Sequence, residues 1–469
     1  MSTILTSDDK KKGIACGVLE SSVPQDWLVK VKSLKIITAL FVCLSLFCST
    51  WASATLLNIE HLSVESEAWI ILDPQSGQVI AEHNSDVKRA PASLTKMMVA
   101  YIALKEINSG KLNRNEILTA TEVVNTVQWD ESQMYLKPTE QISVDQLLAG
   151  LIVMSANDAA VTLAERISGS VPNFIIRMNQ EAQALGMKDT HFSNPAGITM
   201  DDHFSTAHDL ALLGQAVSTE TPHYLYYSKQ QSFTYNLHFH RATNILLKQD
   251  PSVDGLKTGF TKAAGYNLAL TANRPTMQLD LPNRRLVVVV LGAKNAAKRA
   301  EVAHKLMNLA YSYTRNEVAI KDKQIIAELP VIQSTLKMFK VEAKQSRYVT
   351  TSLYASDVTI DLNNFDNQAQ RLVQTDMLGQ SSVLEPLQHT KTHMNVELNT
   401  QSLTAPLAQI MQLAQIQVYQ NNRLIQTFFI EDDVKIEQAN WLERFFDWFK
   451  QLFSFGAESG APAKIYPLG

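Results

Sequence analysis

The sequence predicts an α/β (α+β) domain, followed by a small all-β domain and a C-terminal amphipathic helix. Between residues 62 and 317, short apolar β-runs precede and follow a series of helical patterns, which indicates helices packed on one sheet. From residue 318 to residue 434 the sequence changes to short alternating runs that are typical of β-strands, with a turn at Asn421-Asn422. Residues 440–455 then place apolar and polar side chains on opposite faces of a helix.

Composition is that of an ordinary globular protein. The 469 residues are 45% hydrophobic and 19% charged, and the chain is long enough for two or three domains. The formal charge is −4, so the sequence offers no basic surface for nucleic acid. All three cysteines, Cys16, Cys43 and Cys48, precede residue 54. A chain that loses this leader would contain no thiol and no disulfide.

Residues 1–54 are interpreted as a leader that contains a secretory signal peptide. Three lysines at positions 30, 32 and 35 precede the apolar run 36–51, and Ala52-Ser53-Ala54 supplies small residues at a cleavage position. We predict cleavage after Ala54 and export of the rest of the chain. An uncleaved anchor that spans the membrane once is the alternative, although the run is short for a bilayer core of ~30 Å.

The first elements of the expected domain are a hairpin and a helix. Residues 68–81 contain two apolar runs around a turn rich in proline and glycine, which predicts a β-hairpin. An apolar helical pattern begins at Ser93, runs to about Asn108 and stops near Gly110. A glycine just past the last helical residue is a common helix end.

Two helix starts follow. Residues 143–146 (Ser-Val-Asp-Gln) form a capping box that opens an apolar helix over residues 147–154, and this helix brings Ser155 and Asn157 to its end. Thr206 caps a second helix, with Asp209 at the third position. The local cap explains Asp209, so we interpret this residue as structural.

Three β-runs and a helix complete the domain. Residues 253–257, 266–272 and 286–291 are predicted strands, and the last contains four consecutive valines that should be buried on both faces of the sheet. A helix over residues 297–311 follows.

Ser93 and Lys96 form the first candidate for chemistry. They lie three residues apart at the start of a helix, where the two side chains share a face and can meet. A serine is a poor nucleophile until a base takes its proton, and a lysine is such a base only if burial or nearby charge lowers its pKa. The spacing alone is weak evidence, because it recurs at Ser7/Lys10, Ser85/Lys88 and Ser334/Lys337.

Two later motifs strengthen the case. Ser155-Ala156-Asn157 and then Lys257-Thr258-Gly259 follow in order, and the three motifs together match serine acyl-transferases that handle penicillin and D-alanyl peptides. With the flanking residues 91–98, 155–160, 253–261 and 264–268, the chain resembles the D-alanyl-D-alanine carboxypeptidases, the low-molecular-mass penicillin-binding proteins. The resemblance covers roughly residues 62–430. It implies a serine transpeptidase/β-lactamase-like fold for residues 62–317.

The resemblance also implies a role for each motif residue. Ser93 would attack the carbonyl between the two terminal D-alanines of a peptidoglycan stem peptide, with Lys96 as its base. Ser155 would pass a proton to the leaving amine, and Asn157 would hold the substrate amide. The residues expected to face the terminal carboxylate or the oxyanion are Lys257, Thr258, Gly259, Phe260 and Arg299.

Several of these roles have a simple chemical reason. Attack on a carbonyl builds negative charge on its oxygen, so fixed donors are needed, and the resemblance assigns them to the backbone N–H groups of Ser93 and Phe260. Gly259 would let the backbone come close. Arg299 aligns with a family arginine for the carboxylate, with a surface arginine at a helix start as the alternative. Water would release the acyl-enzyme, whereas a β-lactam would leave slowly and inhibit.

No cofactor and no metal are expected, because the eleven histidines show no ligand spacing. The expected partners are peptidoglycan stem peptides, β-lactam antibiotics and a membrane surface, with a role in cell-wall remodelling and cell shape. The expected location is the periplasmic face of the bacterial inner membrane, with peripheral attachment.

The C-terminal part also carries the resemblance. Ala405-Pro406-Leu407, followed by Val418-Tyr419, is similar to the C-terminal domain of these carboxypeptidases, although Ile410 and Ala414 stand where the family usually has glycines. In the helix 440–455, aromatic and leucine side chains form one wide face and the charges sum to zero. We predict a helix that lies on a membrane through aromatic burial. A helix packed on its own protein is the alternative, and residues 456–469 are expected to be a disordered tail.

Three other functions remain open from the sequence. A β-lactamase shares the motifs, but the Glu-x-x-Leu-Asn pattern of class A enzymes is absent between Asn157 and Lys257. A D,D-endopeptidase acting on cross-links would use the same chemistry, but such relatives generally lack the C-terminal domain. A non-catalytic wall-binding scaffold is the third possibility, which the intact motif residues argue against.

Overall fold

The computed structural model describes residues 55–60, 64–276, 281–353, 359–362, 392–453 and 462–468. The leader expected over residues 1–54 therefore lies outside the described residues. Among the helices that are described, none is long and apolar enough to cross a membrane.

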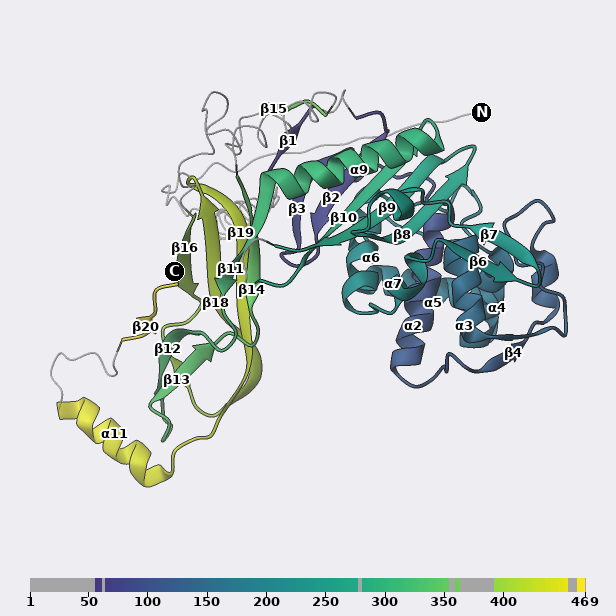
Figure 1. Ribbon diagram of the computed structural model, residues 1–469. Helices are drawn as coiled ribbons and strands as arrows, with labels where there is room; N and C mark the ends of the chain where they lie inside the picture. Colours follow the sequence, from purple (N-terminus) through teal and green to yellow (C-terminus); the bar gives the residue numbers. More distant parts are fainter. Residues whose placement is uncertain are drawn as a thin grey trace, which may run out of the picture. The chain divides into compact units, whose positions relative to one another are not determined.

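A five-stranded antiparallel sheet is the centre of the first domain (Figure 1), with the strand order β3-β2-β10-β9-β8. Its strands are β2 (Ala68–Asp73), β3 (Gln78–His83), β8 (Val253–Thr261), β9 (Gly265–Arg274) and β10 (Arg284–Ala293). The predicted hairpin is confirmed as β2–β3. The later strands extend past the predicted apolar runs, because polar residues at their ends continue the pairing, as where Arg284 lies opposite Arg274.

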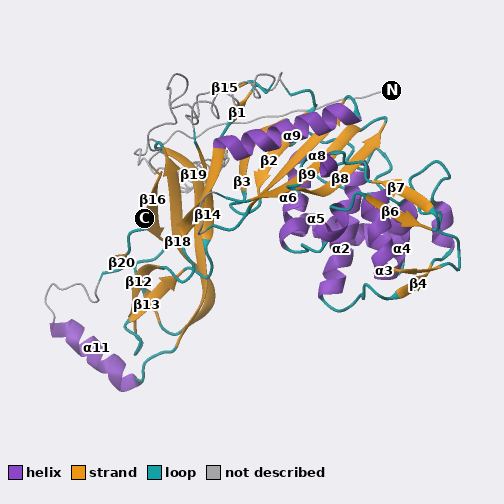
Figure 2. Ribbon diagram, viewed as in Figure 1, coloured by secondary structure: helices purple, strands orange, loops and turns teal. Residues whose placement is uncertain are grey.

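Helices cover both faces of this sheet (Figure 2). The helices of this domain are α2 (Lys96–Asn108), α3 (Val144–Ala149), α4 (Asn157–Ser168), α5 (Val171–Ala184), α6 (Ala207–Thr219), α7 (Tyr224–Ser228), α8 (Leu246–Gln249) and α9 (Ala296–Tyr313). Val287 and Val289 join the apolar cluster of α2, α4 and α6, whereas Val288 and Val290 join that of α9. All four valines are fully buried, which confirms the prediction for this strand.

Both predicted helix caps are present. Ser143 and Gln146 make the reciprocal hydrogen bonds of a capping box at the start of α3. The Thr206 hydroxyl accepts a hydrogen bond from the Asp209 backbone N–H at 3.0 Å, so Asp209 lies at a helix start as predicted. The helix after Ala149 continues as a π-helix, η4 (Gly150–Met154), and ends where Ser155 adopts a left-handed conformation with a φ of 63°.

Short elements complete the first domain. They are the 3₁₀ helices η2 (Ala92–Thr95) and η3 (Glu122–Thr126), the strand pair β4 (Ile117–Thr119) and β5 (Gln141–Ser143), and the strand pair β6 (Ser232–Tyr235) and β7 (His238–Arg241). The predicted helix at Ser93 thus begins as η2 and becomes α-helical at Lys96.

The following region is built of β-strands, as predicted. They are β11 (Thr314–Ile320), β12 (Ile325–Ile332), β13 (Met338–Glu342), β14 (Arg347–Ser352), β15 (Thr359–Ile360), β16 (Thr392–Leu398), β17 (Leu403–Thr404), β18 (Leu407–Gln420) and β19 (Arg423–Ile436). β1 (Asn58–Ile59) pairs with β15. Asn421 and Asn422, with φ of 52° and 62°, make the tight turn between β18 and β19. The boundary expected between residues 317 and 318 falls within β11.

Buried polar contacts connect the first hairpin with these strands. The Ser76 and Thr350 hydroxyl oxygens lie 2.6 Å apart, and the Gln78 amide donates to the Ile425 carbonyl at 3.1 Å. Nearby, Arg284 donates to the carboxylate of Asp73 at 2.8 Å, and both side chains are almost fully buried. Removing one partner of such a pair would leave an uncompensated buried charge.

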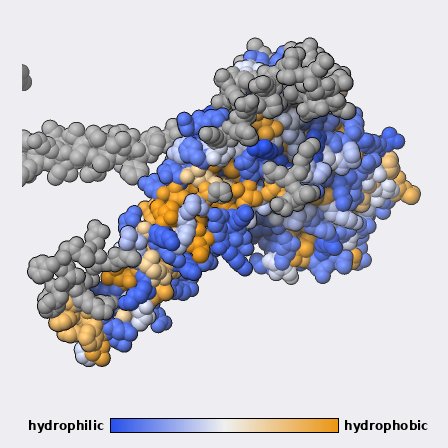
Figure 3. All heavy atoms as spheres, turned by 60° about the vertical axis from the view of Figure 1, so that its left-hand side comes forward, coloured by the Kyte–Doolittle hydropathy of each residue, from blue (hydrophilic) through white to orange (hydrophobic). Residues whose placement is uncertain are grey.

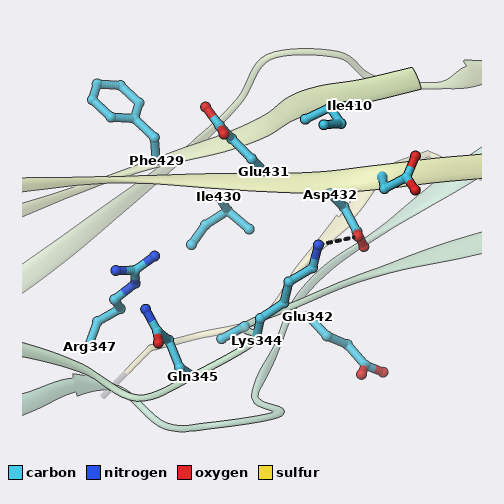
Figure 4. A pocket seen from close by; sticks show the side chains of 11 residues that line it. Glu342, Lys344, Gln345, Arg347, Ile410, Phe429, Ile430, Glu431 and Asp432 are labelled. Atoms are coloured by element: carbon cyan, nitrogen blue, oxygen red, sulfur yellow. Dashed lines mark ion pairs between the residues drawn. The ribbon is translucent and has the colours of Figure 1, made fainter. Parts of the chain in front are cut away.

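A surface pocket of about 310 Å³ lies among the β-strands (Figure 4). Lys344 and Asp432 form an ion pair of 2.7 Å at its side, and Phe429 and Ile410 contribute apolar surface. None of the residues predicted for chemistry lines this pocket.

The C-terminal helix α11 (Trp441–Phe453) agrees with the predicted amphipathic helix. Trp441, Leu442, Phe445, Phe446 and Phe449 are exposed, and Figure 3 shows apolar atoms of this helix at its lower left. These five side chains are therefore not buried against the rest of the described residues.

The tail after α11 differs from its expected disorder. Its strand β20 (Lys464–Ile465) pairs antiparallel with β12, and the Tyr466 N–H donates to the Ile326 carbonyl at 2.9 Å. Ala463 and Leu468 pack against the apolar cluster of the β-strands. These long-range contacts have no local sequence signal, which is why the segment was not predicted as a strand. Residues 454–461 and 469 lie outside the described residues.

Candidate active site

Ser93 and Lys96 meet as predicted. The Nζ atom of Lys96 lies 3.1 Å from the Ser93 Oγ atom, and it also donates to the Ala196 carbonyl at 2.5 Å. Lys96 is fully buried, whereas Ser93 is half-buried at the surface of the site. The serine is therefore open to a substrate, and its neighbouring amine is shielded from water.

Burial prepares Lys96 to act as a base. Burial and then the positive charge of Lys257 lower the pKa of Lys96 well below its usual 10.5, while the carboxylates of Glu131 and Asp158 oppose this shift. A lowered pKa makes the neutral amine, the form that accepts a proton, available at moderate pH. A lysine can serve as a base only if its pKa is lowered, and burial meets this condition for Lys96.

The carbonyl that holds Lys96 belongs to a tight loop. The Asn194 side-chain oxygen accepts hydrogen bonds from the backbone N–H groups of Ala196, Gly197 and Ile198, at 2.7–3.2 Å. This turn fixes the direction of the Ala196 carbonyl. Sequence reasoning missed Asn194 and Ala196, although Ser-Asn-Pro-Ala-Gly at residues 193–197 has the composition of a turn.

The second motif lies where η4 gives way to α4. The left-handed conformation of Ser155 reverses the chain, and its side chain is half-buried. The Asn157 side-chain amide is buried and donates to the Glu131 carboxylate, while its backbone N–H donates to the Ser132 carbonyl at 2.7 Å. Sequence reasoning missed Glu131, which lies in an irregular segment without a motif.

Lys257 and Arg299 are two buried cations beside each other. Lys257 is 3% exposed and Arg299 is 5% exposed. Burial and the charge of Arg299 lower the pKa of Lys257 to about 7, and burial lowers the pKa of Arg299 to about 10. The alternative of a surface arginine at position 299 is therefore wrong.

Neither cation has a carboxylate partner among the described residues. Lys257 donates to the Thr258 carbonyl at 3.0 Å, and Arg299 donates to the carbonyls of Thr243 and Asn267 at 3.2 and 3.4 Å. The buried Nε atom of Arg299 has no partner in the described part of the chain. Because buried charge without a counter-ion is costly, this arrangement favours an anionic ligand. Thr258 follows Lys257 on strand β8, and its hydroxyl contacts the hydroxyl of Thr243.

Gly259 lies where the edge strand β8 approaches Ser93. A Cβ atom added to Gly259 would lie 3.0 Å from the Ser93 backbone nitrogen and 3.2 Å from the Pro91 carbonyl oxygen. A side chain at position 259 would therefore press on the backbone of Ser93. The next residue, Phe260, stacks its half-exposed ring on Tyr266, with 4.3 Å between ring centroids.

Hydrogen bonds and charge interactions connect the three motifs into one site. Lys96 contacts Ser93 and interacts electrostatically with Lys257 and with Glu131, the partner of Asn157. The described residues contain no group of three or more His, Cys, Asp or Glu side chains that could hold a metal ion. The arrangement brings together a serine hydroxyl, a buried amine and two buried cations, which suits acyl transfer from a substrate that ends in a carboxylate.

Comparison with known proteins agrees with this chemistry. The model of the D-alanyl-D-alanine carboxypeptidase family matches residues 55–295. D-alanyl-D-alanine carboxypeptidase DacC of Escherichia coli is 37% identical over 283 residues, which cover 59% of this chain and 69% of DacC. DacA of the same organism is 35% identical over 290 residues, which cover 60% of this chain and 70% of DacA.

Solved structures extend the likeness beyond the family match. Penicillin-binding protein 5 from Haemophilus influenzae has a TM-score of 0.66 and 27% identity, covering 80% of this chain and 98% of that chain. Penicillin-binding protein 6B from Escherichia coli has a TM-score of 0.56 and 26% identity, covering 81% of this chain and 98% of that chain. The likeness therefore includes strands of the C-terminal region.

Proposed function

The chain belongs to the D-alanyl-D-alanine carboxypeptidase family, and we propose that Ser93 is its nucleophile and Lys96 its general base. It is a serine-type carboxypeptidase and a penicillin-binding protein that acts in peptidoglycan metabolism. The observation that carries the residue assignment is the buried Lys96 amine, 3.1 Å from the Ser93 hydroxyl.

The substrate is a peptidoglycan stem pentapeptide that ends in D-Ala-D-Ala. Its terminal carboxylate binds near Lys257, Thr258 and Arg299, where the buried cations have no carboxylate partner among the described residues. This contact places the last peptide bond over Ser93. The Asn157 amide holds the substrate's own amide.

Acylation begins when Lys96 takes the proton of the Ser93 hydroxyl as the oxygen attacks the carbonyl carbon. The backbone N–H groups of Ser93 and Phe260 stabilise the negative charge that develops on the carbonyl oxygen. The proton then passes through Ser155 to the leaving nitrogen, the C–N bond breaks, and D-alanine departs. Water hydrolyses the remaining ester and frees Ser93. A β-lactam acylates the same hydroxyl as its ring opens, and the resulting ester hydrolyses slowly, so the β-lactam inhibits.

Two measurements on the full chain test this proposal. D-alanine release from the pentapeptide reports the carboxypeptidase step, and mass spectrometry after treatment with penicillin locates the covalent adduct. We expect release of one D-alanine per peptide and an adduct on the peptide that contains Ser93. An adduct at another residue would contradict the assignment of the nucleophile. An adduct at Ser93 without release would redirect the activity to cross-linked peptides.

The pH dependence of kcat/KM gives a second test, which concerns Lys257. Its pKa of about 7 in the free enzyme means that the ammonium loses its charge as the pH rises above that value. Since the protonated form binds the substrate carboxylate, kcat/KM should fall above about pH 7. Arginine stays charged throughout this range, so Lys257→Arg should move the fall to higher pH. An unchanged profile in this variant would assign the fall to another group.

We also propose attachment to the periplasmic face of the inner membrane through α11. Its exposed aromatic side chains support this role, and residues 440–455 carry no net charge. Burial of aromatic rings in the interface should then supply the affinity. The full chain should sediment with vesicles of neutral phosphatidylcholine, and Phe445→Ser/Phe449→Ser should reduce the bound fraction severalfold. Strong loss of binding at high salt would instead indicate electrostatic attachment.

A further inference from the structure

Glu131 lies beside the reacting groups but belongs to none of the three motifs. It is half-buried in the irregular segment between η3 and β5, and its carboxylate accepts the hydrogen bond from the Asn157 side-chain amide. The segment is fixed to α4 at further points. The backbone N–H groups of Met134 and Leu136 donate to the buried Asp158 carboxylate, each at 3.0 Å. Glu131 is therefore held in place rather than free to swing away.

A carboxylate at this position decides how the Asn157 amide is turned. An ionised carboxylate only accepts hydrogen bonds, whereas an asparagine side chain has one donating end and one accepting end. Glu131 must therefore bind the NH₂ end of Asn157. The Oδ1 atom and one remaining N–H are left for other partners. A neutral partner that can both donate and accept would allow either orientation.

The same carboxylate acts on the base. The charged groups that influence Lys96 come from separate elements: Lys257 from β8, Asp158 from α4 and Glu131 from the loop. His203 contacts the neighbouring Thr95 hydroxyl at 2.9 Å, and burial lowers the pKa of this histidine to about 4, so it is neutral near pH 7. Glu131 favours the protonated form of Lys96, and Lys257 favours the neutral form.

We propose that Glu131 is a positioning residue of the acylation reaction, which fixes the orientation of the Asn157 amide and supplies a negative charge near Lys96. This inference rests on the proposed roles of Asn157 and Lys96. Glu131 acts through these two residues and does not touch the reacting atoms. Its removal should therefore change the rate and the pH dependence together.

The experiment compares three variants of the full chain with the wild type. Glu131→Gln keeps the size and removes the charge, Glu131→Asp keeps the charge, and Asp130→Asn removes the charge of the exposed neighbouring carboxylate. For each protein, the acylation rate with a fluorescent penicillin and the D-alanine release from the pentapeptide are measured against pH. Thermal unfolding of each variant reports its stability.

Glu131→Gln should lower the acylation rate at its plateau about tenfold, as expected for a lost orienting hydrogen bond. The acidic limb of its pH profile, where the acylation rate falls as Lys96 becomes protonated, should move to lower pH. The reason is that Lys96 loses a neighbour that favours its protonated form. Glu131→Asp should keep the acidic limb of the wild type and recover part of the rate. Asp130→Asn should match the wild type in both measurements.

A wild-type rate and acidic limb in Glu131→Gln would overturn the inference. A lower rate with an unmoved limb and a lower melting temperature would also overturn it, because it would indicate a structural role only. The penicillin measurement separates this inference from the substrate assignment. If the wild type is acylated but releases no D-alanine, the carboxypeptidase proposal fails while the acylation series still decides the role of Glu131.

Discussion

Lys96→Met should lower the rate of D-alanine release from the pentapeptide on the order of 10⁴-fold or more, to the same residual rate as Ser93→Ala. The reason is that the Ser93 hydroxyl and the Lys96 amine, 3.1 Å apart, act as one unit. A serine without its base is as ineffective as a base without its serine. The double variant should therefore be no slower than either single variant.

The fold should tolerate this substitution. Lys96 is fully buried, and it donates hydrogen bonds to a hydroxyl and a carbonyl oxygen rather than to a carboxylate. Replacing a buried charge by an apolar side chain of similar volume is often neutral or stabilising when no ion-pair partner is left behind, and no carboxylate of the described residues forms an ion pair with Lys96. Thermal unfolding of Lys96→Met should thus show no large loss of stability, and the lost rate can be assigned to chemistry.

The matched control is Lys105→Met, the same change on the same helix, α2. Lys105 pairs with Glu181 at 2.7 Å, on a surface away from the three motifs. A partly exposed pair of this kind contributes little to stability, so the control should release D-alanine at the wild-type rate. A double variant that is much slower than Ser93→Ala alone would show that Lys96 acts independently of the serine. A Lys96→Met rate close to wild type would require a different base.

The parts of the fold that the sequence predicts are those with local causes. The capping box at Ser143 needs only neighbouring residues, and the turn at Asn421-Asn422 needs only side chains that tolerate positive φ. The meeting of Ser93 and Lys96 follows from helical spacing in the same way. The strand of four valines is recognisable because burial on both faces leaves no alternation.

The rest of the site depends on contacts between residues that are distant in the chain. Ala196 reaches Lys96 across a separation of 100 residues, and nothing in the sequence near residue 196 indicates a basic partner. Arg299 could be a surface residue from its local sequence, but packing of α9 on the sheet buries it near Lys257. The strand β20 forms because β12 offers an edge, and periodicity cannot detect a two-residue strand.

Gly259→Ala should lower the acylation rate by on the order of 10²–10³-fold while leaving the chain folded. The added methyl group would lie 3.0 Å from the Ser93 backbone nitrogen and 3.1 Å from the Ala92 Cβ atom. Its neighbours would have to move by a few tenths of an ångström. The Ser93 N–H is a proposed donor to the carbonyl oxygen, so the methyl group would shift this donor and cover its approach. Alanine fits the strand backbone at this position, since Gly259 is not among the glycines with positive φ.

Gly110→Ala is the control that separates lost stability from lost geometry. Gly110 follows α2 with a φ of 76°, and a Cβ atom there would have open space around it. Alanine at this position strains the backbone by about 1 kcal/mol but lies outside the three motifs. This variant should unfold at a lower temperature than the wild type and acylate at the wild-type rate. Gly259→Ala should instead remain folded and acylate slowly. Acylation of Gly259→Ala within threefold of the wild type would mean that the Ser93 N–H is not a donor to the oxyanion, because no substrate oxygen could reach it past the methyl group without loss of rate.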